Sequence, residues 1–299
     1  MSKYSNRPME NTFTISSDRL KVEVVWPGSS IQKGARFDLS GHIVQVTLDG
    51  RHVFCAPEAS DADRGSGGLG LCNEFQDISC SMYNEAMPGE KFPKMGVGLL
   101  TRKTEEDYFF MTHYEKVPYP IEVSVSDRFA DFLVQPVECL GYAARIEKSL
   151  CVDSNNLLIK YFFVNTGSRP IEVLEYDHNF ICIDNNPIGP DYSFRLPYEI
   201  KMDKIPDVLL LNGREITWKK IPEEAFYCLP KGYEGMDSHM WELVYKPGNV
   251  GVREYSNFPA HNLAFWGLRH VASPEVFIKV NLNPGESLGW SRRYEFFCA

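Results

Sequence analysis

Two titratable side chains stand where an ordinary β-strand would carry apolar or solvated residues, and the first is His178. Strand alternation over residues 174–183 divides the side chains between two faces, with Tyr176, His178, Phe180 and Cys182 on one and Glu175, Asp177 and Asn179 on the other. Polar groups on both faces of a central strand are costly unless they are paired or functional. Imidazole titrates near neutral pH, so His178 is a candidate proton donor or acceptor. The alternative is a buried, hydrogen-bonded histidine that organises the sheet.

The second side chain is Glu275, at the start of a run that alternates as a strand. Val276, Ile278, Val280 and Leu282 form the expected core face, which leaves Glu275 on the opposite face with Phe277 and Lys279. A partly desolvated carboxylate is a stronger base than a solvated one. The alternative is a solvated glutamate at a strand edge, paired with Lys279.

Composition limits the classes of partner. The 299 residues are 43% hydrophobic and 24% charged, as in globular proteins, and the formal net charge is −9. This balance argues against a nucleic-acid binder and against an electrostatic grip on a membrane. No run reaches the ~18 apolar residues of a membrane span, and the polar segment 1–17 does not resemble a signal peptide. We therefore expect a cytoplasmic protein whose eight cysteines are reduced.

Residue alternation indicates that strands must position these two side chains. Period-two patterns cover residues 20–26, 44–48, 121–126 and 275–282, and about fifteen strands are expected in all, with no long helical period. The sequence predicts one all-β domain over residues 1–299, with residues 1–17 as a loose N-terminal segment.

Turn residues punctuate these strands. Asp49-Gly50 and Asn212-Gly213 are dipeptides typical of tight hairpins. Residues 56–90, rich in Gly, Asp, Ser and Pro, are predicted to form a long excursion over the surface.

Two familiar motifs match the sequence but lack the context that they need, and metal ligation is only weakly supported. Residues 65–70 match Gly-x-Gly-x-x-Gly, but neither the preceding strand nor the following helix of a dinucleotide site is predicted. Residues 285–289 match Gly-x-Ser-x-Gly, but no histidine follows them. The seven histidines show no local metal-ligand spacing, so no metal site is predicted.

Several segments resemble the aldose 1-epimerases, or galactose mutarotases. The resemblance lies in the central strands and in the C-terminal strands, at residues 156–161, 165–167, 176–180, 263–267, 273–275, 283–287 and 294–296. It implies a large antiparallel β supersandwich of the galactose mutarotase-like type. The family's second histidine, in a His-Gly-Gly-like segment, has no match here, and residues 64–75 occupy that region.

The resemblance also implies a reaction. A cyclic aldose opens when the anomeric hydroxyl loses a proton and the ring oxygen gains one, and reclosure gives the other anomer. By motif position, Glu275 is the implied base and His178 the implied acid, with no metal and no organic cofactor. The implied partner is a small-molecule sugar, with no nucleic acid or membrane, and the protein is expected to be a monomer or homodimer.

Further residues are predicted to contact the substrate. Carboxylates and lysines suit the recognition of hydroxyl groups, and tryptophan can stack on a sugar ring. The predicted contacts are Glu74, Lys94, Asp177, Trp266 and Arg36. The alternatives are solvated loop charges and a core tryptophan.

Two other functions remain open. The first is a carbohydrate-binding protein without catalysis, since a fold does not fix a function. The second is a sugar-phosphate 1-epimerase, which predicts basic residues such as Arg269, Arg36 and Lys94 at the pocket. Catalysis requires His178 and Glu275 to face each other across one pocket, a sugar ring apart.

Overall fold

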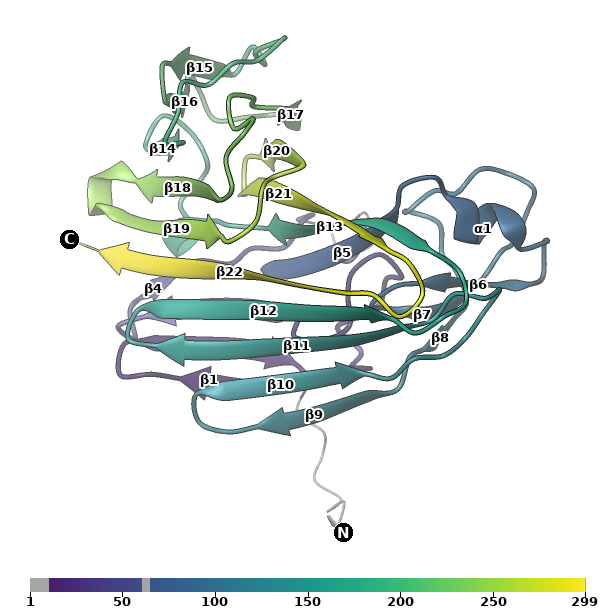
Figure 1. Ribbon diagram of the computed structural model, residues 1–299. Helices are drawn as coiled ribbons and strands as arrows, with labels where there is room; N and C mark the ends of the chain where they lie inside the picture. Colours follow the sequence, from purple (N-terminus) through teal and green to yellow (C-terminus); the bar gives the residue numbers. More distant parts are fainter. Residues whose placement is uncertain (1–10, 61–64, 299) are drawn as a thin grey trace.

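The computed structural model describes residues 11–60 and 65–298, which form antiparallel sheets almost throughout (Figure 1). The first sheet has nine strands, of which β4 (His52–Val53) pairs only with β3. The other eight lie in the spatial order β1 (Thr12–Ser16), β2 (Leu20–Val25), β3 (Ile43–Leu48), β5 (Leu71–Asp77), β13 (Ile171–Asn179), β21 (Val271–Leu282), β20 (Asn262–Leu268) and β17 (Phe226–Cys228).

The second sheet has ten strands. Their spatial order is β15 (Leu209–Asn212), β16 (Glu215–Trp218), β14 (Tyr192–Arg195), β18 (His239–Tyr245), β19 (Val250–Ser256), β22 (Ser287–Cys298), β12 (Asn156–Asn165), β11 (Ala144–Asp153), β10 (Phe129–Val134) and β9 (Ile121–Val125). A third, small sheet consists of β6 (Lys91–Lys94), β7 (Gly98–Thr101) and β8 (Lys116–Pro118). These sheets confirm the all-β prediction.

The hydrophobic core lies between the two large sheets, which overlap as layers in Figure 1 with β22, β12 and β11 in front. Alternation turns one side of each strand inward. Phe75 of the first sheet meets Tyr161 and Trp290 of the second at ring-centroid distances of 5.9 and 6.4 Å. The opposite face of the first sheet is therefore free to carry other groups.

Both predicted hairpins form. Asp49 and Gly50 have φ of 53° and 63°, as a tight turn between β3 and β4 requires. Between β15 and β16, Asn212 pairs with Glu215, so the turn residues there are Gly213 and Arg214.

Two predictions about loops are wrong in part. Within residues 56–90, the segment Leu71–Asp77 is the buried strand β5, and Ser81–Glu85 forms the helix α1. Within residues 1–17, Thr12–Ser16 forms β1, while residues 1–10 lie outside the described part of the chain. The sequence does not indicate β5 as a strand, because Asn73 and Glu74 are polar. In the structure both residues are buried against charged partners.

Helices contribute little to this fold. In residues 11–60 and 65–298, no helix has the length and apolar character needed to cross a bilayer.

Candidate active site

His178 of β13 and Glu275 of β21 meet on the outer face of the nine-stranded sheet, which points away from the core. His178 Nδ1 lies 3.0 Å from Glu275 Oε1, and only 2% of His178 and 7% of Glu275 are exposed. Tyr176 and Phe180 flank the imidazole at centroid distances of 4.6 and 5.7 Å, which confirms the predicted alternation. The expected separation of one sugar ring is wrong for this structure, because the two groups touch directly.

Glu74 of β5 lies on the other side of the imidazole and gathers two of the predicted binding residues. Its Oε1 accepts a hydrogen bond from Lys94 Nζ at 3.0 Å. Its Oε2 accepts from Arg36 Nε at 2.6 Å and from the Tyr176 hydroxyl at 2.7 Å. His178 Nε2 is 3.4 Å from the same oxygen, an ion-pair contact without hydrogen-bond geometry. Three predicted contacts, Glu74, Lys94 and Arg36, are thus brought beside His178.

The charges around His178 set its protonation state. Burial would raise the pKa of Glu74, but Lys94 and Arg36 more than offset this and hold that pKa well below its usual range. Burial would likewise lower the pKa of His178, but the Glu275 carboxylate more than offsets it, so the pKa rises above 6.5. His178 therefore carries its proton more readily than a solvated histidine and can act as an acid near neutral pH.

Aromatic rings enclose the imidazole. Phe37 meets it edge-on at 5.0 Å, and Tyr176 stacks on Phe277 at 4.1 Å. Gly68 packs against Phe180 so closely that a Cβ there would lie 2.3 Å from the ring. These contacts explain why His178 is so little exposed. Solvent reaches the pair mainly from the Glu275 side, where a tenth of the side chain is exposed.

The segment 102–115 covers the two cations of the site. Arg36 lies over the Phe110 ring at 4.2 Å, and Lys94 lies 5.7 Å from the Tyr108 ring centroid. Near Arg36 is a hollow of about 490 Å³. It is lined by residues 31, 33–35, 57, 59, 65–69 and 110–114. His178 and Glu275 do not line this hollow.

The prediction that Asp177 contacts the substrate is wrong. Asp177 is 2% exposed and lies on the core side of β13, because successive side chains of a strand point to opposite faces. Its Oδ1 accepts a hydrogen bond from the Val276 backbone at 2.7 Å, and its Oδ2 accepts from the Tyr294 hydroxyl at 3.0 Å. A ligand over His178 would be separated from it by the sheet.

The remaining candidates lie farther out. Trp266 on β20 is half-buried and meets Phe180 edge-on at 6.1 Å, so it lies near the site without touching the pair. Arg269 is exposed in the turn between β20 and β21 and does not join the other basic residues.

Sequence reasoning missed Glu58 and Ser66, which fix Arg36 from the side opposite Glu74. The Ser66 hydroxyl accepts from Arg36 Nη1 at 2.9 Å and lies 2.8 Å from both carboxylate oxygens of Glu58. The glycine-rich segment 65–70 is therefore tied to the site. Its Gly-x-Gly-x-x-Gly pattern was the signal in the sequence, although that pattern suggested a different chemistry.

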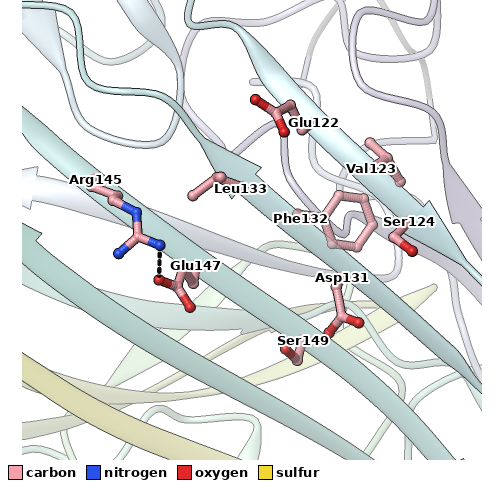
Figure 2. A pocket seen from close by; sticks show the side chains of 9 residues that line it. All are labelled: Glu122, Val123, Ser124, Asp131, Phe132, Leu133, Arg145, Glu147 and Ser149. Atoms are coloured by element: carbon pink, nitrogen blue, oxygen red, sulfur yellow. Dashed lines mark ion pairs between the residues drawn. The ribbon is translucent and has the colours of Figure 1, made fainter. Parts of the chain in front are cut away.

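Another hollow, of about 330 Å³, lies on the second sheet over β9, β10 and β11 (Figure 2). Its polar side chains include Glu122, Asp131 and Arg145, and Arg145 forms an ion pair with Glu147 at 2.5 Å. No histidine lines it, so it lacks the acid–base pair found on the first sheet.

Comparison with known proteins places the fold. No protein-family model matches the chain, and no curated protein matches it. Several solved structures, however, resemble the chain. One is a candidate aldose 1-epimerase from Escherichia coli, which has a TM-score of 0.62 at 12% identity and covers 96% of this chain and 99% of its own. A galactose mutarotase-like protein from Lactobacillus casei has a TM-score of 0.61 at 12% identity, covering 96% and 100%.

A third structure, a galactose mutarotase-like protein from Clostridium acetobutylicum, has a TM-score of 0.59 at 10% identity, covering 96% of this chain and 95% of that one. At such identities the likeness shows the fold alone. It confirms the galactose mutarotase-like architecture predicted from the sequence.

Proposed function

We propose that this protein is an isomerase similar to the aldose 1-epimerases, which interconverts the anomers of a sugar by acid–base ring opening. The observation that supports this is the 3.0 Å contact between His178 and Glu275 on the outer face of a mutarotase-like sheet. Glu275 is the base that takes the proton of the anomeric hydroxyl. His178 is the acid that protonates the ring oxygen.

Direct contact between acid and base suits this reaction. The anomeric hydroxyl and the ring oxygen are both bonded to the same carbon, so the groups that serve them must be neighbours. A sugar that displaces the hydrogen bond between His178 and Glu275 replaces it with two bonds of its own. Glu275 is the side chain that moves, because it is the more exposed of the two.

The contacts favour Nδ1 as the nitrogen of His178 that acts as the acid. Nδ1 faces Glu275 and the solvent side, whereas Nε2 faces the buried Glu74. The ionised Glu74 stabilises the imidazolium, and Arg36, Lys94 and Tyr176 hold that carboxylate in place. General acid or base help of this kind contributes about 10²–10⁴-fold per group.

The charges at the site favour a neutral sugar over a sugar phosphate. Arg36 and Lys94 lie at the site, as a phosphate would require, but both already bind Glu74. Arg36 also contacts Glu58 at 3.4 Å. A phosphate would have to compete with these carboxylates for the same cations.

The second candidate is a sugar-binding protein without catalysis. The burial of His178 favours it, because a reacting sugar must displace existing contacts to reach the imidazole. Both functions predict sugar binding, and only the first predicts faster mutarotation.

Polarimetry on freshly dissolved α-anomers tests the proposal, using neutral aldoses and aldose 6-phosphates. We expect the wild type to accelerate mutarotation, and His178→Ala and Glu275→Gln each to lose about 100-fold or more of that acceleration. His52→Ala is the matched control, because His52 pairs with Asp184 at 2.7 Å elsewhere in the molecule. An unchanged rate in a variant that carries both His178→Ala and Glu275→Gln would overturn the assigned roles. Sugar binding without acceleration in the wild type would favour the second candidate.

A further inference from the structure

Pairing between β13 and β21 is interrupted at the candidate acid and base. Backbone pairing runs from Ile171 with Leu282 to Tyr176 with Phe277 and then stops. It resumes at Ile181 and Ala272, which exchange two backbone hydrogen bonds of 3.0 and 2.9 Å. The two paired stretches share one register, because the numbers of the two partners add to the same total in every pair of both stretches. The strands therefore part and rejoin without a slip.

The shared register shows which residues face each other in the gap. His178 is opposite Glu275, Asp177 is opposite Val276, and Asn179 is opposite Pro274. In an antiparallel ladder, hydrogen-bonded pairs alternate with non-hydrogen-bonded pairs. Since Ile181 and Ala272 are a hydrogen-bonded pair, the missing backbone bonds belong to the two pairs on either side of His178 and Glu275.

Side chains take the place of those backbone bonds. The Val276 N–H donates to Asp177 Oδ1 at 2.7 Å, and the Pro274 carbonyl accepts from Asn179 Nδ2 at 2.7 Å. The Asn179 N–H donates to Ser273 Oγ at 3.1 Å. Asp177 and Asn179 act as spacers between the two strands on the core side of the sheet. Ser273 lies on the same face as Glu275 and also donates a hydrogen bond to Glu275 Oε1 at 3.1 Å.

The spacers are themselves anchored to the second sheet. The Tyr294 hydroxyl lies 3.0 Å from Asp177 Oδ2 and 2.9 Å from Asn179 Oδ1, and Arg292 Nη2 donates to the Val276 carbonyl at 2.9 Å. The side chains of Asp177, Asn179, Arg292 and Tyr294 are all buried. The width of the gap is thus fixed from the interior of the molecule.

We infer that Asp177 and Asn179 are positioning residues, which hold β13 and β21 apart at His178 and Glu275 and so set the contact between these two side chains. Pro274 alone does not account for the gap. Proline removes one backbone donor, whereas the gap extends to Val276, whose N–H is present and bonds to Asp177. The catalytic meaning of this inference rests on the proposed function, but the geometry does not.

The test compares two buried asparagines that bond to β21. Asn179→Ala removes the bond to the Pro274 carbonyl beside the site. Asn165→Ala is the control, because Asn165 is also buried and donates at 2.9 Å to the Leu282 carbonyl at the other end of the strand. Should Asn179→Ala fail to fold, Asn179→Ser replaces it, since serine is too short to reach that carbonyl.

The readout is the pKa of His178, measured by NMR titration of the imidazole signals, with His178→Ala identifying its signal among the seven histidines. We expect this pKa to fall toward 6.5 in Asn179→Ala, because a longer distance to Glu275 weakens the ion pair. We expect no change in Asn165→Ala. Equal pKa values in the two variants would overturn the inference.

Activity provides a separate readout. If the wild type accelerates mutarotation, kcat falls in Asn179→Ala with KM little changed, and both are retained in Asn165→Ala. If the wild type has no such activity, the proposed function fails while the titration still decides whether Asn179 positions His178.

Discussion

Strand β13 carries a buried cluster of charges on each face, and the two clusters balance their charges differently. The outer cluster combines three cationic side chains with three carboxyl groups: Arg36, Lys94 and His178 with Glu58, Glu74 and Glu275. The inner cluster, between the sheets, combines two cations with four carboxyl groups: Lys148 and Arg292 with Asp38, Glu175, Asp177 and Glu254.

The inner cluster has an excess of carboxyl groups, and it reduces that excess by favouring the protonated form of Glu254. Burial, followed by the charge of Asp177, raises the pKa of Glu254 well above its usual range. Arg292 binds Glu175 at 2.8 Å, and Trp241 Nε1 donates to Glu254 at 2.7 Å. Its members thus depend on one another and on the core.

The outer cluster balances three cationic side chains with three carboxyl groups, and Glu275 lies at its edge toward solvent. Glu275 is partly exposed, and its bond to His178 is the contact that a polar ligand would replace. The comparison teaches that burial of a charged group does not by itself indicate a function. What distinguishes the outer cluster is that Arg36, Glu58 and Glu275 keep 10–15% of their side chains exposed, whereas the ion-paired side chains of the inner cluster are at most 2% exposed.

The largest expected effect separates the clusters by stability. Arg292→Met leaves several carboxyl groups without their cation in the core, and we expect it to lower the free energy of unfolding by about 3–5 kcal/mol. Arg293→Met is the matched control, because Arg293 follows on the same strand and is 41% exposed. It should cost less than about 1 kcal/mol. Urea unfolding measures both, and equal losses would show that the inner cluster does not carry the stability assigned to it.

The contrast between the clusters also shows what the sequence could predict. Alternation placed His178 and Asp177 on opposite faces, because the side-chain period of a strand is local. The turn at Asp49-Gly50 was predictable for the same reason. The general fold and the pairing of His178 with Glu275 on one site followed from the resemblance to the aldose 1-epimerases.

The role of β5 could not be predicted, because its partners are distant in the sequence. Asn73 and Glu74 look like loop residues until Glu175, Lys148, Lys94 and Arg36 surround them. The same holds for the gap between β13 and β21. Only the structure shows that the Asp177 carboxylate accepts a hydrogen bond from the Val276 backbone and does not face a ligand.

The next effect concerns the outer cluster. Arg36→Met removes one of the cations on Glu74, which keeps its bonds to Lys94 and Tyr176. We therefore expect a loss of about 1–3 kcal/mol in urea unfolding, smaller than that of Arg292→Met. Arg195→Met serves as a control, since Arg195 pairs with two glutamates but is 53% exposed. A loss equal to that of Arg292→Met would erase the distinction between the clusters.

A pH series sharpens the comparison through His178. Because its pKa is raised in the folded state, the folded protein holds this proton more tightly than the unfolded chain. Its contribution to stability is therefore complete below pH 6.5 and is lost as the pH rises through the folded-state pKa. We expect the stability of the wild type to fall with pH above 6.5 more steeply than that of His178→Gln. Parallel curves, measured by urea unfolding between pH 6 and 9, would contradict this.

The smallest effect belongs to Glu254, whose raised pKa acts over a lower pH range. The folded state keeps Glu254 protonated where the unfolded chain has lost the proton, so stability falls as the pH rises above about 4.5, the usual pKa of a glutamate. Glu254→Gln mimics the protonated carboxyl group, and we expect it to change stability by less than about 1 kcal/mol at pH 5. At higher pH the variant should become the more stable protein, because it has no proton to lose.

The two clusters would then lose stability over different pH ranges, the inner one from pH 4.5 and the outer one from pH 6.5. Urea unfolding of Glu254→Gln and His178→Gln over the same pH series decides this, and a single shared range would mean that the two faces of β13 titrate as one unit.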